Sequence, residues 1–402
     1  MTPRPDLSCT GREVVSNSKR NLFYNPVFRS IAFQAVALAI LGFAIYSIVD
    51  NTLYNLEQRG ITTGFDFLHQ EAGFGIGLSL IDYDETYSYG RTFFVGLINT
   101  ALVSILGILL ASLLGFTIGI ARLSGNWLVN RLAAVYIETF RNIPLLLQIF
   151  FWYFAVLQAL PSPKQSIQLS DAVFLNVRGL YLAKPVLQEG GGWLIATVVV
   201  AITLAIIFRF YAKRKQRITG QQSPIMLINC LILIGLPIFG YFASGMPVNF
   251  EYPELKGFNF QGGIAIIPEL AALLLALSIY TAAFIAEIVR AGINAVDTGQ
   301  TEAARSLGLS AGKTLRLIVI PQALRIIIPP LTSQYLNLTK NSSLAMAIGY
   351  PDLVSVFAGT TLNQTGQAIE IIAMTMAVYL ALSLLTSLLM NIYNRKVALV
   401  ER

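Results

Sequence analysis

The fold of this chain is decided by an apolar run at residues 264–290, IAIIPELAALLLALSIYTAAFIAEIVR. A helix needs about 20 apolar residues to cross the hydrocarbon core of a bilayer. Other runs of spanning length lie at residues 30–49, 93–121, 132–160, 192–212, 224–243, 327–349 and 368–392. The sequence therefore predicts an all-α membrane protein with about eight transmembrane helices.

The composition excludes an ordinary soluble protein. Charged residues make up 12% of the chain and hydrophobic residues 55%, whereas soluble domains carry about 25% charged residues. The net charge of +7 does not indicate nucleic-acid binding, because the basic residues gather in the gaps between apolar runs. A single histidine and two cysteines supply no metal-ligand cluster, which argues against a membrane enzyme.

The distribution of basic residues predicts the topology. With the N-terminus in the cytoplasm, 20 of the 28 lysines and arginines fall on the cytoplasmic side of an eight-helix arrangement, as the positive-inside rule requires. Both termini are therefore expected inside, and the first run is expected to be a retained helix rather than a cleaved signal. The expected parts are a cytoplasmic tail (1–29), a first helix (30–49), a long acidic outer loop (50–91), a first core part (93–160), an inserted region with two helices (161–263), a second core part (264–394) and a cytoplasmic tail (395–402).

The longest cytoplasmic connection between spans has a helical pattern at residues 297–321, DTGQTEAARSLGLSAGKTLRLIVIP. Asp297 and Gln300 fit a capping box, and Gly308 fits the left-handed position that ends a helix. Ser310 is positioned to cap a second helix, which Pro321 is expected to interrupt. The pattern predicts a short helix, a glycine turn and a second helix at the membrane surface.

This loop resembles a known family motif. Glu302-Ala303-Ala304, Gly308 and Ile320-Pro321 are similar to the EAA loop of importer permeases in the ATP-binding cassette (ABC) superfamily. The stretches 140–148, 279–292 and 328–343 resemble spans of polar amino-acid permeases. The resemblance covers residues 93–160 and 264–394 as the five-helix core of a type I importer permease. The three extra helices resemble those of the longer subunit of the general L-amino-acid importers.

The resemblance implies an importer permease that moves amino acids across the bacterial cytoplasmic (inner) membrane by alternating access. It implies four kinds of partner besides lipid: a second homologous permease, ABC ATPase subunits, a periplasmic solute-binding protein and the amino-acid substrate. ATP and Mg²⁺ would belong to the ATPase, since this chain has no Gly-x-x-x-x-Gly-Lys-Ser/Thr loop and no cofactor is expected in it. The residues expected to couple the permease to the ATPase are Glu302, Ala303, Ala304, Gly308 and Pro321.

Polar residues inside the predicted spans are candidates for a substrate path, because such groups do not face lipid. Glu138 and Glu287 each precede an arginine by three residues, and each pair fits either a gate or an ion pair. A polar stripe in the seventh span fits either a path or bonding to a neighbouring helix. The candidates are Glu138, Arg141, Gln148, Tyr280, Thr281, Glu287, Gln334, Asn337, Lys340, Asn341 and Ser343.

A secondary transporter driven by protons or sodium is the main rival. It would be expected to show inverted repeats and a carboxylate at mid-membrane, and neither is visible in the sequence. The outer loops 50–91, 161–191 and 244–263 are equally consistent with docking surfaces for an external partner and with solvated connectors.

Overall fold

The computed structural model describes residues 26–58, 63–221 and 223–397 of the chain. Most of the predicted N-terminal tail, residues 1–25, and the last five residues lie outside this part. The chain divides into two compact units, Met1–Phe65 and Asp66–Arg402, and each unit is described by itself. Seven helices are long and apolar enough to cross a membrane, or eight if one bent pair is a single span, within the described residues. The predicted count and the helical class are therefore confirmed.

The first unit contributes one long helix, α1 (Pro26–Gln58). Large apolar side chains such as Phe33 and Phe43 are exposed on it. A helix that is apolar on all sides is suited to lipid rather than to water. The predicted span 30–49 lies inside this helix.

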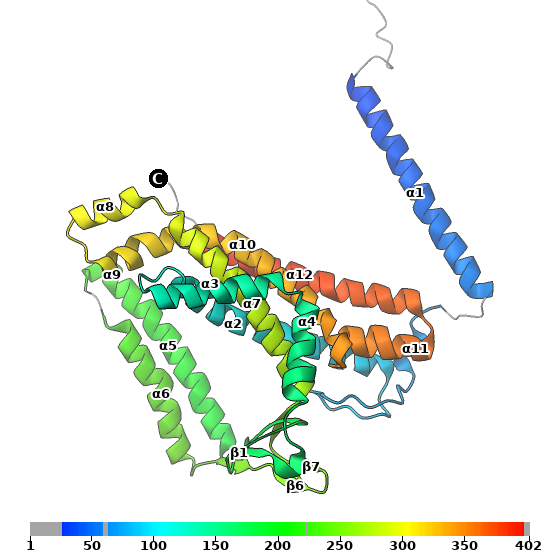
Figure 1. Cartoon of the computed structure of the whole chain (residues 1–402), viewed down its shortest axis with the longest axis horizontal. Coiled ribbons are helices and arrows are strands. Elements are labelled where there is room, and N and C mark those ends of the chain that lie inside the picture. The colour runs from blue at the N-terminus through cyan, green and yellow to red at the C-terminus, as the bar shows by residue number, and fades with distance from the viewer. Residues whose placement is uncertain (1–25, 59–62, 222, 398–402) are drawn as a thin grey trace, which may run out of the picture. The chain divides into compact units, whose positions relative to one another are not determined.

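The centre of the second unit is the pair α2 (Tyr89–Ala121) and α7 (Pro268–Asn294), which pack along each other (Figure 1). Glycines on α2 allow this close approach. A Cβ built on Gly115 would lie 2.6 Å from the Cβ of Ile285, and one on Gly119 would lie 2.8 Å from the carbonyl oxygen of Ala286. Small residues bring membrane helices together in this way.

The predicted third span, 132–160, is not one straight helix. It consists of α3 (Trp127–Asn142), α4 (Leu145–Phe150) and the π-helical segment η3 (Phe151–Leu157), and the two halves are bent by 106°. The break falls at Ile143-Pro144, where Ile143 is extended with φ −95° and ψ 127°. A proline pushes the residue before it out of the helical region, which explains the position of the break.

The inserted region contains α5 (Gly191–Thr219) and α6 (Ile225–Ala243), in agreement with the spans predicted at 192–212 and 224–243. These two helices lie side by side (Figure 1). Gly240 of α6 lies directly against Thr197 of α5, where a Cβ would come within 2.3 Å of the threonine hydroxyl oxygen.

After α7 come α8 (Thr298–Ser306), α9 (Ala311–Thr314), the π-helical segment η5 (Leu315–Val319) and α10 (Ile320–Asn341). The prediction that Pro321 interrupts the second helix is wrong, because the helix runs on from Ala311 to Ile348. The π-helical segment just before Pro321 changes the hydrogen-bond spacing where the proline cannot donate. The predicted span 327–349 is therefore the later part of a longer helix.

The chain then forms the 3₁₀ segment η6 (Ser342–Ile348), the π-helical segment η7 (Val354–Thr361), α11 (Leu362–Thr365) and α12 (Ala368–Val397). Gly349, with φ +76°, makes the turn after η6. The eighth predicted span, 368–392, coincides with α12. The short segments η7 and α11 between the last two long helices are not predicted by the sequence.

The two loops on either side of α5 and α6 build small antiparallel sheets rather than separate connectors. β1 (Ile167–Ser170), β2 (Val173–Asn176), β3 (Gly179–Leu182) and β8 (Ile264–Ile266) form one sheet in that order. β4 (Lys184–Leu187) pairs with β5 (Val248–Glu251), and β6 (Glu254–Lys256) pairs with β7 (Asn259–Gln261). The sixth predicted span therefore begins later than residue 264, with Pro268 opening α7.

Candidate functional site

The predicted helix–turn–helix between α7 and α10 is confirmed in its backbone (Figure 1). Asp297 caps α8 by accepting a hydrogen bond from the backbone N–H of Gly299 at 2.8 Å. At the other end, the N–H of Leu309 donates to Ala304 O and that of Gly308 donates to Arg305 O. With Gly308 at φ +76°, these two bonds form a Schellman motif, so the end of the helix is fixed.

Two details of the predicted caps differ. The Gln300 side chain accepts a hydrogen bond from Gln322 of α10 at 3.4 Å instead of completing the capping box. Ser310 makes no side-chain capping bond to α9. The contact between Gln300 and Gln322 joins α8 directly to the start of α10, so the helices before and after the glycine turn are linked to each other.

The faces of α8 differ in burial. Ala304 is buried against the protein, whereas Glu302 and Ala303 are exposed. Leu307, just past the helix, is 81% exposed. The segment therefore presents a carboxylate, a small side chain and an apolar side chain on its free face.

The polar stripe predicted in the seventh span, which runs from α10 into η6, is partly exposed. Asn337 and Lys340 are exposed, while Gln334, Asn341 and Ser343 are half-buried. Lys340 and Ser343 line a cavity of about 540 Å³ together with Thr375, Tyr379 and Ser383 of α12. The structure thus brings two residues of the stripe to a cavity, and their role in a substrate path stays a prediction.

The two Glu–Arg pairs behave differently. Arg290 Nε donates to Glu287 Oε2 at 3.0 Å, so this pair is an ion pair within α7. Glu138 and Arg141 on α3 are both exposed, and they form no ion pair with each other in the described part of the chain. Arg141 instead lies over the ring of Phe284, 5.2 Å from its centroid. Arg141 therefore links α3 to α7.

The remaining path candidates lie in the protein interior. Gln148 is buried, and its Nε2 donates at 3.0 Å to the carbonyl oxygens of Phe140 and Ile143. Gln148 therefore bridges the break in the third span, a structural role that the sequence did not predict. Thr281 is buried, and Tyr280 packs against Phe284 with ring centroids 4.9 Å apart.

A buried group of polar residues ties α2 to the turn after η6. Asn99 Nδ2 donates to Leu78 O at 2.8 Å and to Pro351 O at 2.9 Å. The hydroxyl of Tyr350 donates to Asn99 O at 3.1 Å. Asp352, which is fully buried, accepts from Ser355 N at 2.9 Å and from the Tyr379 hydroxyl at 3.3 Å.

Asp352 lies between the last two spans, and burial raises the pKa of its carboxyl group to about 7. Desolvation penalises the charged form of a buried acid, and the hydrogen bonds from Ser355 and Tyr379 offset only part of that effect. The carboxyl group is therefore poised to change its charge near neutral pH.

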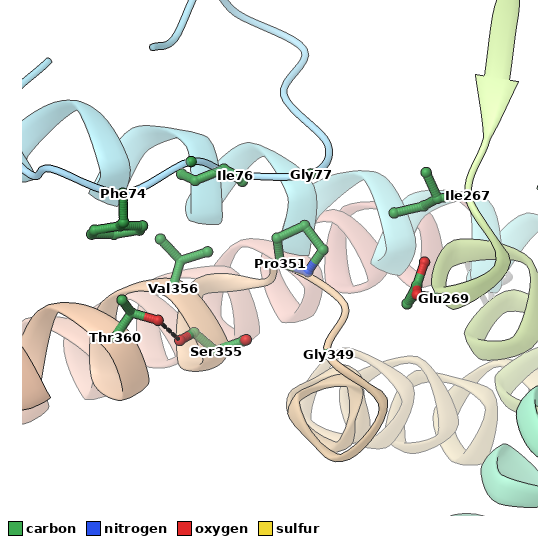
Figure 2. Close-up of a pocket in the computed structure, with 11 residues that line it drawn as sticks. Phe74, Ile76, Gly77, Ile267, Glu269, Gly349, Pro351, Ser355, Val356 and Thr360 are labelled. Carbon is green, nitrogen blue, oxygen red and sulfur yellow. Dashed lines mark hydrogen bonds between the residues drawn. The ribbon is translucent and has the colours of Figure 1, made fainter. Parts of the chain in front are cut away.

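Two further cavities lie at the end of α7 that is opposite α8. One has a volume of about 280 Å³ and is lined by Phe74–Gly77, Glu269 and residues of the η7 region. Figure 2 shows the Phe74–Gly77 segment on one side of this cavity, with Val356, Ser355 and Thr360 of η7 on the other. The second has a volume of about 600 Å³ and reaches the β-strands.

Comparison with known proteins decides the family. The chain is 59% identical to a putative amino-acid ABC transporter permease (YhdX) of Escherichia coli K12 over 94% of this chain and 97% of that protein. It is 50% identical to the general L-amino acid transport system permease AapQ of Rhizobium johnstonii over 96% of each chain. The chain belongs to the amino-acid ABC transporter permease family. It is a multi-pass protein of the bacterial inner membrane and a transport component of an ABC importer of amino acids.

Two other matches accompany these relatives. Residues 218–399 of the permease match the family of binding-protein-dependent transport system inner membrane components. A solved structure of an amino acid ABC transporter with histidines is 23% identical to it, with a TM-score of 0.46 over 77% of this chain and 95% of that one.

Two residues of the permease, one in the buried polar group and one at the two cavities, were not predicted from the sequence. Asp352 stands in a stretch outside the predicted spans, and Glu269 lies at the first turn of a span rather than in its middle. The Pro-Glu pair at residues 268–269 is the one signal that could have drawn attention to Glu269, because a proline often opens a helix.

Proposed function

We propose that this permease moves L-amino acids of several chemical classes and is driven through α8 by a separate ATPase subunit. In this arrangement both termini and α8 lie in the cytoplasm, and ATP and Mg²⁺ bind to the ATPase alone. A second homologous permease completes the pathway by alternating access, and a periplasmic binding protein delivers the substrate. The broad range of substrates is supported by the 50% identity to a general L-amino acid permease.

The observation that carries the coupling proposal is the free face of α8. Its ends are fixed by the Asp297 cap and the Schellman motif at Gly308, so the helix can transmit a push without unwinding. Glu302 is exposed and available to pair with a basic group of the ATPase. Ala303 has only a methyl group, which allows a second surface to come close, and exposed Leu307 offers an apolar contact.

The remaining coupling residues have supporting roles in this proposal. Ala304 is the buried side of α8 and holds it against the rest of the permease. Pro321 follows the π-helical segment that connects the turn to α10. Movement of α8 is then passed to α10 and on to η6, which place Lys340 and Ser343 at a cavity.

Vesicles that contain the complete importer test this function. The vesicles are oriented so that the ATPase faces the lumen. Uptake of labelled glutamine, alanine and leucine should then require ATP in the lumen, and it should persist when ion gradients are collapsed. Unlabelled amino acids of other classes should compete. Uptake that needs an ion gradient and ignores ATP would overturn the proposal.

The role of α8 has its own test. Ala303→Trp should reduce co-purification of the ATPase and uncouple ATP hydrolysis from uptake, because a bulky side chain keeps the surfaces apart. Ala243→Trp is the matched control, since Ala243 is also exposed but ends α6. Normal ATPase binding in Ala303→Trp would remove α8 from the contact.

A further inference from the structure

The two cavities at the β-strand end of the second unit adjoin each other. Both are lined by Gly77, Ile267 and Glu269. Figure 2 places Glu269 beside Ile267 at one end of the smaller cavity, away from Phe74 at the other end. A group bound at Glu269 in the larger cavity therefore stands next to the smaller one, which continues to Gly349 and Ser355.

The larger cavity carries two opposite charges that do not neutralise each other. Glu269 and Arg178 both line it, and neither forms an ion pair with any residue that the structure describes. Glu269 Oε1 accepts a hydrogen bond from the Tyr153 hydroxyl at 2.9 Å. Within the described part of the chain, the other carboxylate oxygen and the guanidinium group remain available for a ligand.

The backbone position of Arg178 is fixed by its turn. Its backbone N–H donates to Asn176 Oδ1 at 2.8 Å, and Asn176 is buried. The next residue, Gly179, has φ +130°, and a Cβ on it would lie 2.3 Å from the carbonyl oxygen of Ile266. The turn between β2 and β3 is thus seated on the segment that leads into α7, which carries Glu269.

The remaining walls suit a small organic ligand. Val177, Phe260, Ala265 and Ile267 are apolar, and Gln158 and Asn259 add amide groups. A carboxylate and a guanidinium that form no ion pair with a described residue line the same cavity, and together they match a molecule that carries both an ammonium and a carboxylate group. Guanidinium groups bind carboxylates through two parallel hydrogen bonds, so the charges also set the orientation of the ligand.

We infer that this cavity is a binding site for zwitterionic α-amino acids, in which Glu269 holds the α-ammonium group and Arg178 holds the α-carboxylate. The site rests on the proposed function, because it receives the substrate at the end of α7 opposite the ATPase contact. The inserted region 161–263 then takes part in substrate binding, since it contributes Arg178. The apolar walls do not select for one particular side chain of the bound amino acid, which agrees with a broad range of substrates.

Binding of L-glutamine to the purified importer in detergent, without binding protein, tests the site. Two analogues separate the charges: L-glutamine α-amide lacks the carboxylate, and N-acetyl-L-glutamine lacks the ammonium group. Each analogue should bind the unmodified importer about tenfold or more weakly, as expected for loss of a charge-assisted hydrogen bond. The variants are Glu269→Gln and Arg178→Gln, with Glu251→Gln and Lys184→Gln as controls, since both control side chains are exposed and lie outside the cavity.

Each variant should stop discriminating between glutamine and one of the two analogues, and should still discriminate against the other. Glu269→Gln should bind glutamine and its N-acetyl analogue about equally, and Arg178→Gln should bind glutamine and its α-amide about equally. The controls should bind like the unmodified importer, and all variants should elute as the intact complex. If both variants keep full discrimination while ATP-driven uptake continues, the site is wrong and the proposed function stands. If the unmodified importer takes up no amino acid, the proposed function fails instead.

Discussion

Gln148 donates from Nε2 to the carbonyl oxygen of Phe140 at 3.0 Å, and this bond joins the two sides of the 106° break in the third span. A second bond of equal length goes to Ile143 O. The break leaves carbonyl groups without helical partners, and in an apolar setting unpaired carbonyls are costly. One buried amide therefore replaces hydrogen bonds that the helix itself has lost.

Gln148→Leu should destabilise the permease by about 1–3 kcal/mol, because the carbonyl groups of Phe140 and Ile143 at the break lose their donor. The change keeps a similar volume, so the loss of packing is small. Thermal unfolding in detergent measures the effect. Gln188→Leu is the control, since Gln188 is exposed and outside the spans. Equal melting temperatures for the two variants would show that the bridge contributes nothing.

Gly308→Val should weaken binding of the ATPase and leave membrane insertion intact. Gly308 has φ +76°, and a side chain in the left-handed region costs about 1–2 kcal/mol, so the Schellman turn should open. Gly312→Ala is the matched control, because Gly312 lies inside α9 and has open space around it. Co-purification of the ATPase checks both variants. Full binding by Gly308→Val would mean that the turn does not need this geometry.

The features that could be predicted from the sequence are those whose signal lies within one segment of the chain. Hydropathy located every long helix, and the caps Asp297 and Gly308 were readable because capping depends on neighbours in the chain. The break at Pro144 was missed because a hydropathy average does not register a change of direction. The bridging bonds of Gln148 were missed for the same reason, since its partners Phe140 O and Ile143 O come within reach only when the helix bends.

Contacts between distant segments could not be predicted. Leu182 of β3 pairs with Ile264 of β8, and each strand has only three or four residues, too few for a periodic pattern. Asn99 and Pro351 are 252 residues apart. Arg178 and Glu269 meet at one cavity because the turn at Gly179 rests on Ile266, a relation that neither residue type reveals alone.

Gly115→Ala should destabilise the pairing of α2 and α7. The added methyl group would lie 2.6 Å from the Cβ of Ile285, and overpacking of this kind typically costs about 1–3 kcal/mol. Gly235→Ala is the control, because a Cβ at Gly235 of α6 meets nothing within 4 Å and alanine favours the helix. Melting temperatures in detergent should fall for Gly115→Ala alone. A melting temperature at or above that of the unmodified protein would mean that α2 and α7 accommodate the added methyl group without loss of stability.

Asp352 should make stability depend on pH. Its pKa is about 7 in the folded protein, against 3.8 for the free side chain, so the folded state binds more protons between these values. Stability then falls as pH rises from about 4 to about 7, by up to about 4 kcal/mol, and the loss is complete above pH 7. Melting temperatures across this range measure the fall.

Other acidic residues also titrate in this window, so the informative quantity is the difference between the unmodified protein and Asp352→Asn. Asparagine has the same shape and can still accept a hydrogen bond from Ser355 N, but it carries no charge. The variant should match the unmodified protein near pH 4 and become the more stable of the two near pH 8. Parallel pH profiles would show that Asp352 stays ionised throughout, held by the hydrogen bonds from Ser355 and Tyr379.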